Sequence, residues 1–172
     1  MTKIEIFKSQ LYPTGHQMHV AYTNNVLIKA EILRKLDTIF DDRFAITGGE
    51  DSHLFMRLYK SGYKLVWAHE AIVHESIPKS RTNAQWILRR GYHSYSTHSL
   101  IEKELYPSIK VQAIRIVKGF GRIIMGIFLV IPSLVQGKHA VINALLNIYR
   151  GVGTFAGLLG MHHQEYQTVD EV

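Results

Sequence analysis

The chain of 172 residues is long enough for one domain with a sizeable core, or for a small domain with an appendage. It contains no cysteine, which excludes disulfides, thiolate metal sites and cysteine nucleophiles and fits a reducing compartment. The net charge is +6, and the excess lies between Tyr106 and Gln164, where no acidic residue occurs. The basic residues of that region are Lys110, Arg115, Lys118, Arg122, Lys138 and Arg150.

This change of composition coincides with a proline at Tyr106-Pro107 and predicts a boundary there. We therefore expect a domain at residues 1–105 and a membrane-associated helical tail at residues 106–172. The first ten residues lack the long apolar core of a cleavable signal peptide, so the amino end is expected on the cytosolic side.

In chain order, the first part predicts short strands that alternate with helices. Runs rich in β-branched and aromatic residues predict extended segments at residues 19–22, 26–28, 63–68 and 71–74. Apolar residues at helical spacing predict helices at residues 30–36, 52–61 and 82–91.

Two glycines and two acids, Gly48-Gly49-Glu50-Asp51, precede the predicted helix 52–61. Glycine opens backbone conformations closed to other residues, and an acid at a helix start suits the positive end of the helix dipole. A carboxylate fixed there could accept a proton from a bound hydroxyl. An acidic N-cap on a surface helix gives the same pattern, so the choice between a catalytic and a capping role depends on the neighbouring motifs.

Asn25 and two histidines are further candidates for a site. The Asn25 amide can bind either the local backbone or a sugar hydroxyl. His69 and His74 are five residues apart, whereas the helical zinc-protease motif needs two histidines four apart, so zinc hydrolysis is excluded. A single histidine such as His74 more often satisfies a backbone carbonyl than binds a metal.

The last third contains three apolar blocks, at residues 123–135, 140–149 and 152–161, with Pro132 interrupting the first. None reaches the about 20 apolar residues of a spanning helix. Upstream, Arg115, Lys118 and Arg122 share one helical face opposite apolar positions, the pattern of a helix lying in a membrane interface. Packing on protein and a short tilted span or re-entrant hairpin are the alternatives. Nucleic acid is not expected, because the cations are embedded among aliphatic residues.

Short motifs follow one another in a recognisable order between residues 12 and 166. They are Asn25, Phe40-Asp41-Asp42-Arg43-Phe44, Gly48-Gly49-Glu50-Asp51, Arg57, Gly62-Tyr63, Val66-Trp67, Glu70-Ala71-Ile72-Val73, Glu75, Pro78, Arg81, Trp86, Arg89-Arg90, Gly91, and the tail from Arg150-Gly151 to Glu165-Tyr166. This order resembles the second half of family 2 glycosyltransferases, and within them the bacterial exopolysaccharide enzymes of the succinoglycan glucosyltransferase type. The acidic pair followed by an arginine-containing helix is its most specific part.

The resemblance implies the C-terminal part of a GT-A fold, an α/β sandwich on a nucleotide-binding sheet, followed by amphipathic and hydrophobic helices. It implies an inverting enzyme that transfers a sugar from a nucleotide-sugar donor, expected to be a UDP-sugar, to a saccharide or lipid-linked acceptor. Exopolysaccharide or cell-surface glycan synthesis at the cytoplasmic face of the inner or plasma membrane is the expected setting.

The same resemblance implies roles for individual residues. Asp51 matches the general base, and Glu50 would support the base or the acceptor. Asn25 and Gly49 would belong to the substrate site. Arg81, Trp86, Arg89 and Arg90 match the family's arginine and tryptophan motif, which closes over donor and acceptor. His74 falls near a C-terminal ligand for Mn²⁺ or Mg²⁺, although Glu75 aligns better.

The family's first half, with its donor nucleotide site and Asp-x-Asp metal motif, has no counterpart in these 172 residues. We therefore expect the main metal ligands on a separate or missing N-terminal half and little or no transfer by this chain alone. The alternative is a non-catalytic membrane-peripheral adaptor or a decayed remnant that retains only the second half of the fold.

Overall fold

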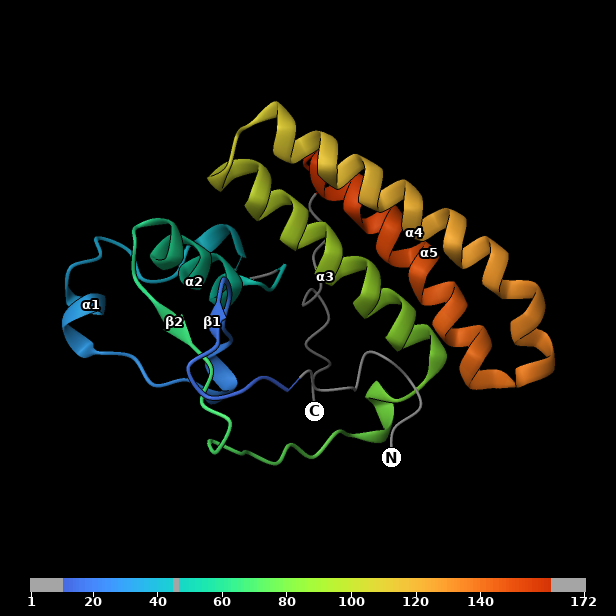
Figure 1. Cartoon of the computed structure of the whole chain (residues 1–172), viewed down its shortest axis with the longest axis horizontal. Helices are drawn as coiled ribbons and strands as arrows, with labels where there is room; N and C mark the ends of the chain where they lie inside the picture. Colours follow the sequence, from blue (N-terminus) through green and yellow to red (C-terminus); the bar gives the residue numbers. More distant parts are fainter. Residues whose placement is uncertain (1–10, 45–46, 162–172) are drawn as a thin grey trace, which may run out of the picture. The chain divides into compact units, whose positions relative to one another are not determined.

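The computed structural model describes residues 11–44 and 47–161, which divide into two compact units (Figure 1). The mixed unit comprises the described residues up to Glu75, and the helical unit comprises residues 76–161. The boundary predicted near residue 106 falls at the turn between two helices of the helical unit.

The mixed unit consists of a small sheet and short helices. Its elements are β1 (Gln17–Met18), the 3-10 helix η2 (Thr23–Asn25), α1 (Ala30–Arg34), the 3-10 helix η3 (Asp42–Phe44), α2 (Glu50–Lys60) and β2 (Leu65–Val66). The two strands pair antiparallel, with Gln17 opposite Val66 and Met18 opposite Leu65.

Helix α2 forms the centre of the mixed unit. Its apolar residues Leu54, Phe55 and Leu58 are buried at the three- and four-residue spacings of one helical face. Partly buried side chains pack around them: Ala21, Ile28, Ile32, Leu33, Leu36, Tyr63 and Leu65. The helix ends at Lys60 because Gly62 adopts the left-handed conformation, at φ +89°, and turns the chain toward β2.

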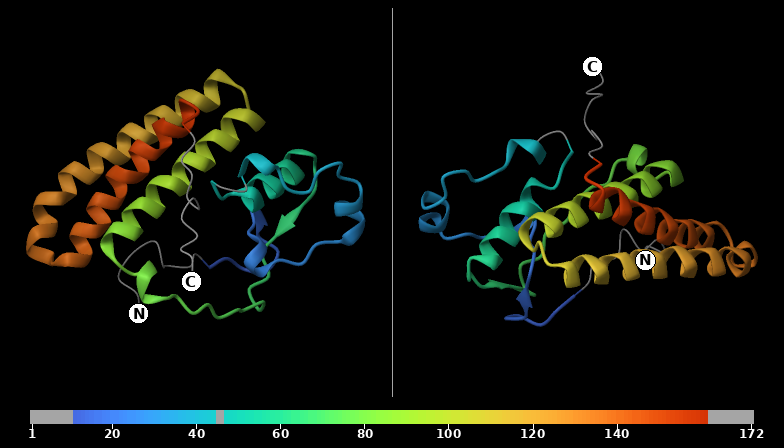
Figure 2. Two further views of the ribbon diagram at one scale, coloured as in Figure 1. Left: turned by 180° about the vertical axis from the view of Figure 1, so that it is seen from behind. Right: turned by 90° about the horizontal axis from the view of Figure 1, so that it is seen from above.

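The helical unit contains three long helices. They are α3 (Ala84–Leu105), α4 (Ile109–Gln136) and α5 (Lys138–Leu158), preceded by the 3-10 helix η4 (Lys79–Arg81). Helix α5 packs along both α3 and α4, and both views of Figure 2 show the three running side by side. The side chain of Asn83 caps α3 by accepting the Trp86 N–H at 2.8 Å.

Glycines allow these helices to approach closely. Cβ atoms at Gly153 and Gly157 of α5 would collide with the backbone carbonyls of Tyr92 and Ser96 in α3. A Cβ at Gly126 of α4 would meet the Ala144 carbonyl oxygen of α5 at 2.8 Å. Small residues at helix contacts let the backbones come within reach of one another, which accounts for the glycine spacing of α5.

Three predicted helices are confirmed. Helices α1 and α2 fall on residues 30–36 and 52–61, although α2 begins two residues earlier, and the helix predicted at 82–91 is the first half of α3. The strand predicted at 63–68 is present as β2. The strands predicted at 19–22 and 71–74 are wrong, because extended backbone becomes a strand only where a partner strand pairs with it. Residues 26–28, predicted only to be extended, also pair with no described strand, and Val26 has the expected extended backbone. The described chain is thus mainly helical with a two-stranded sheet.

Two predictions about the tail are also wrong. Helix α4 continues through Pro132, and α5 joins the blocks 140–149 and 152–161 across Arg150-Gly151. The gap between the blocks 123–135 and 140–149 does separate two helices, because Gly137 adopts φ +96° between α4 and α5. Among the described helices, none combines the length and the apolar character that a membrane crossing requires.

The predicted cationic face of α4 has a different role from the one expected. The Arg115 guanidinium donates to the Glu102 carboxylate of α3 and is 12% exposed. Arg122 stacks on the Tyr95 ring of α3 at 4.7 Å and donates to its hydroxyl at 3.4 Å. These two arginines therefore stabilise the contact between α4 and α3 and do not point toward lipid headgroups.

Candidate active site

The backbone at Gly48 and Gly49 places an acidic pair at the start of α2. These glycines adopt φ values of +72° and +97°, in the left-handed region that side chains disfavour. Gly49 is the N-cap residue, and Glu50 and Asp51 occupy the first helical turn. Both side chains are half-buried at the amino end of the helix.

The Asp51 carboxylate is oriented by donors from two segments of the chain. Its Oδ1 accepts the Ser52 backbone N–H at 2.6 Å and the Ser52 hydroxyl at 3.4 Å. Its Oδ2 accepts the Thr23 backbone N–H of η2 at 3.4 Å. A carboxylate held by such donors has a fixed direction and keeps the capacity to accept a further proton or hydrogen bond.

Asn25 lies two residues beyond Thr23 and fastens η2 to another segment. Its Nδ2 donates to the Ala71 carbonyl at 2.8 Å, a backbone contact 46 residues away rather than the local one considered from the sequence. The neighbouring Thr14 hydroxyl donates to Glu70 at 2.6 Å and accepts the His69 N–H at 2.9 Å. The segment 69–71 is thereby held on the side of η2 that carries Asn25.

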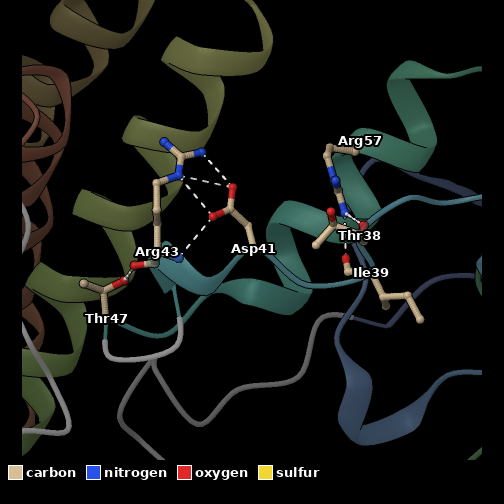
Figure 3. Close-up of polar contacts among 6 residues, drawn as sticks. All are labelled: Thr38, Ile39, Asp41, Arg43, Thr47 and Arg57. Carbon is tan, nitrogen blue, oxygen red and sulfur yellow. Dashed lines mark hydrogen bonds and ion pairs between the residues drawn. The ribbon is translucent and has the colours of Figure 1, made fainter.

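The loop that leads into α2 is held by two arginines (Figure 3). Arg57 of α2 donates from Nη2 to the Thr38 and Ile39 carbonyls, at 2.9 and 2.6 Å. Arg43 and Asp41 form an ion pair at 2.7 Å. The hydrogen bonds from Arg43 lower the pKa of Asp41 to about 2.

These loop contacts limit the role of the arginine in the most specific motif. Arg57 lies in the helix that follows the acidic pair, and its guanidinium is engaged with backbone carbonyls 18 and 19 residues upstream. It therefore positions the loop before Gly48 and contributes to the site indirectly.

The described residues do not form a metal site. His74 is exposed in the segment between β2 and η4, and no group of three or more His, Cys, Asp or Glu side chains gathers in the described part of the chain. A bound Mn²⁺ or Mg²⁺ needs several oxygen or nitrogen ligands that converge. The described residues thus do not by themselves fit the metal that the family resemblance implies.

The predicted arginine and tryptophan group belongs to the helical unit. Arg81 lies in η4 and Arg89 in α3, and both are exposed. Trp86 is half-buried and packs on the core cluster of Ile87 and Leu146. Arg90, also in α3, is half-buried. The structure thus gathers these four residues near the start of α3, whereas Asp51 lies in the mixed unit.

Sequence reasoning missed the contributions of Thr23 and Ser52 to the site. Both bind Asp51 through backbone N–H groups, and any residue except proline supplies such a donor. No side-chain pattern could have identified Thr23. The only available signal for Ser52 was its position directly after the acid at a helix start.

Comparison with known proteins assigns the chain to a family. Residues 2–152 match the model of glycosyl transferase family group 2, and the chain belongs to that family. The chain is 26% identical over 159 residues to the succinoglycan biosynthesis protein ExoM of Rhizobium meliloti (strain 1021). That match covers 91% of this chain and 50% of ExoM, so the chain spans about half the length of this curated relative. No solved structure matches significantly. The resemblance predicted from the sequence is confirmed.

Proposed function

We propose that this chain is the acceptor-binding half, with the general base, of an inverting glycosyltransferase of GT-A fold. The observation that carries the proposal is the Asp51 carboxylate, held at the start of α2 by N–H groups of Ser52 and Thr23 within the region that matches the family. The half-length match to a succinoglycan biosynthesis protein supports a role in exopolysaccharide or cell-surface glycan synthesis.

In the proposed reaction Asp51 accepts the proton of the acceptor hydroxyl. The hydroxyl oxygen attacks the anomeric carbon of the donor, and the bond from that carbon to the diphosphate breaks with its electron pair on the leaving oxygen. The product carries a new glycosidic bond of inverted configuration, and a nucleoside diphosphate departs. A base within hydrogen-bond reach of the hydroxyl contributes a rate factor on the order of 10² to 10⁴.

The remaining candidate residues have supporting roles in this proposal. Glu50, in the same helical turn, would bind the acceptor or support the base, and Gly49 permits close approach of the acceptor to the backbone. Arg81, Arg89 and Arg90 would stabilise the charge of the leaving diphosphate, because planar guanidinium groups bind phosphate oxygens in pairs. Trp86 would close over the sugars.

The donor and the metal are assigned to residues outside this chain. We expect a UDP-sugar donor, Mn²⁺ or Mg²⁺ bound by an N-terminal half, and a saccharide or lipid-linked acceptor at the cytoplasmic face of the inner membrane. The roles proposed for the residues of this chain do not involve binding the metal.

The proposal is tested first by acceptor binding to the chain itself. The isotope-labelled 172-residue chain is titrated with saccharides from the glycan fraction of the source cells and followed by two-dimensional NMR. The amide signals of Thr23 and Ser52 should shift. Signals of α5 serve as the internal control and should not move. Shifts spread evenly over both units, or none, would favour the alternative of a non-catalytic adaptor.

The second test is catalytic. The purified chain should show no turnover of UDP-sugars alone and should support transfer once it is combined with a nucleotide-binding half. Turnover by the isolated chain would contradict the proposal that donor binding requires a separate nucleotide-binding half. Failure of every combined enzyme to transfer sugar, with acceptor binding intact, would reduce the chain to a binding module.

A further inference from the structure

One face of α4 is a continuous apolar stripe with no covering element in the helical unit. At about 3.6 residues per turn, its members recur on one side of the helix over roughly 27 Å. They are Val117, Ile124, Phe128, Ile131, Leu134 and Val135. Phe128, Ile131 and Val135 are 74%, 76% and 92% exposed, although contiguous apolar surface is rare on soluble monomers.

The opposite side of α4 is already occupied, which fixes the direction of the stripe. Gly119, Gly126 and Ser133 are the buried residues of α4 and recur every seven residues. Cβ atoms at Gly119 and Gly126 would contact Thr154 and Ile148 of α5. Because α5 fills that side, α4 cannot turn its stripe inward without losing its packing in the helical unit.

The helical unit that carries the stripe has a strong excess of positive charge. Residues 76–161 contain eleven Lys and Arg residues but only two acids, Glu102 and Glu104. Lys110 stands about five helical turns before Phe128 and so lies on the line of the stripe. Lys118 is exposed on its flank, and the exposed Lys138 directly follows the turn that ends α4.

We propose that the α4 stripe is a lipid-binding surface that lays the helical unit on an anionic membrane. The apolar side chains enter the boundary between headgroups and acyl chains, and Lys110, Lys118 and Lys138 meet the anionic headgroups. Arg115 and Arg122 are engaged with α3 and stay out of this contact. The inference is independent of the chemistry proposed at Asp51.

The charges favour lipid over a second copy of the chain. Pairing two stripes would bring the lysines of two strongly basic units together, and self-repulsion of like charges opposes such a complex. An anionic bilayer satisfies the apolar and the cationic parts of the surface at once. Each lysine near such a surface strengthens binding roughly fivefold, and added salt weakens this part of the attraction.

The experiment measures partitioning of the full chain onto vesicles. Binding should be strong to vesicles of phosphatidylglycerol with phosphatidylcholine, weak to phosphatidylcholine alone, and reduced by salt. The double variant Phe128→Ser/Ile131→Ser should partition at least about tenfold more weakly. Leu27→Ser is the matched control, because Leu27 is 99% exposed in the mixed unit, and it should bind like the wild type.

Two further measurements separate lipid from other partners. Lys118→Gln should weaken binding to the anionic vesicles, whereas Lys64→Gln, a charge removal in the mixed unit, should not. In Phe128→Trp the indole fluorescence should shift to the blue on binding and be quenched by brominated lipid. The proposal is overturned if the wild type binds neither type of vesicle, or if Leu27→Ser weakens binding as much as Phe128→Ser/Ile131→Ser does. It is also overturned if light scattering shows a dimer of the wild type that Phe128→Ser/Ile131→Ser dissociates.

Discussion

The Thr23 backbone N–H of η2 lies 3.4 Å from Oδ2 of Asp51, and this contact joins two segments that are 28 residues apart in the sequence. Asn25 ties the same 3-10 helix to Ala71 at 2.8 Å. The orientation of the candidate base is therefore set by parts of the chain that meet only in the folded mixed unit. Effects on chemistry and on local structure can be separated by substituting these residues one at a time.

The first prediction concerns Asp51. In the enzyme completed with its nucleotide-binding half, Asp51→Asn should lower the transfer rate by about 10² to 10⁴, because the amide cannot accept the acceptor proton. The amide oxygen can still accept the Ser52 N–H, and only the long 3.4 Å contact from the Thr23 N–H is lost, so thermal unfolding should change little. Radiolabelled sugar transfer and circular dichroism of the same preparation provide the two readouts. If activity and folding fall together, Asp51 has a structural role only.

The second prediction concerns Asn25. Asn25→Ala removes the hydrogen bond to the Ala71 carbonyl and should lower the free energy of unfolding of the mixed unit by about 0.5–1.5 kcal/mol, measured by urea denaturation. As a positioning residue it should mainly reduce kcat. A large rise in KM for the acceptor with kcat unchanged would show that Asn25 binds the sugar directly.

The sequence predicted the central helix and the acidic pair well because both depend on local physics. The spacing of Leu54, Phe55 and Leu58 and the positions of Gly49 and Gly62 fix the length and the buried face of α2. The Thr23 donor to Asp51 was not predictable, because a backbone N–H leaves no trace in residue type. The strand predicted at 71–74 failed because strand pairing is a property of distant segments.

The role of the α4 cations was misjudged for a related reason. Periodicity correctly separated Arg115 and Arg122 from the apolar stripe, but it cannot tell which face meets protein and which meets solvent. That choice depended on Glu102 and Tyr95, both in α3, and on the packing of glycines in α5. Neither feature is local to α4.

The third prediction is acid sensitivity of the helical unit through Glu102. Burial opposes ionisation of this carboxyl, but hydrogen bonds from His98 and Arg115 outweigh it and lower its pKa to about 2. A lowered pKa in the folded state stabilises the fold above the unfolded pKa of 4.5, and this contribution is lost as the pH falls from there toward 2.

Glu102→Gln removes the charge that this linkage needs. At neutral pH the variant should be less stable by about 1–3 kcal/mol, since it leaves the mostly buried Arg115 guanidinium without its charged acceptor. Below pH 4 the difference from wild type should shrink. The linkage is measured as the melting temperature of both proteins between pH 3 and pH 7, at roughly one point per pH unit. A constant difference at all pH values would contradict the ion pair.

The fourth prediction compares two glycines of the helical unit. At Gly157 a Cβ would collide with the Ser96 carbonyl of α3, whereas at Gly121 of α4 nothing lies within 4 Å. Gly157→Ala should therefore destabilise the unit by about 1–3 kcal/mol, as overpacking does, because α3 and α5 must move apart. Gly121→Ala should stabilise it by about 0.5–1 kcal/mol through helix propensity. Urea denaturation measures the free energy of unfolding of both variants. If both substitutions raised it, α3 and α5 would not pack through Gly157.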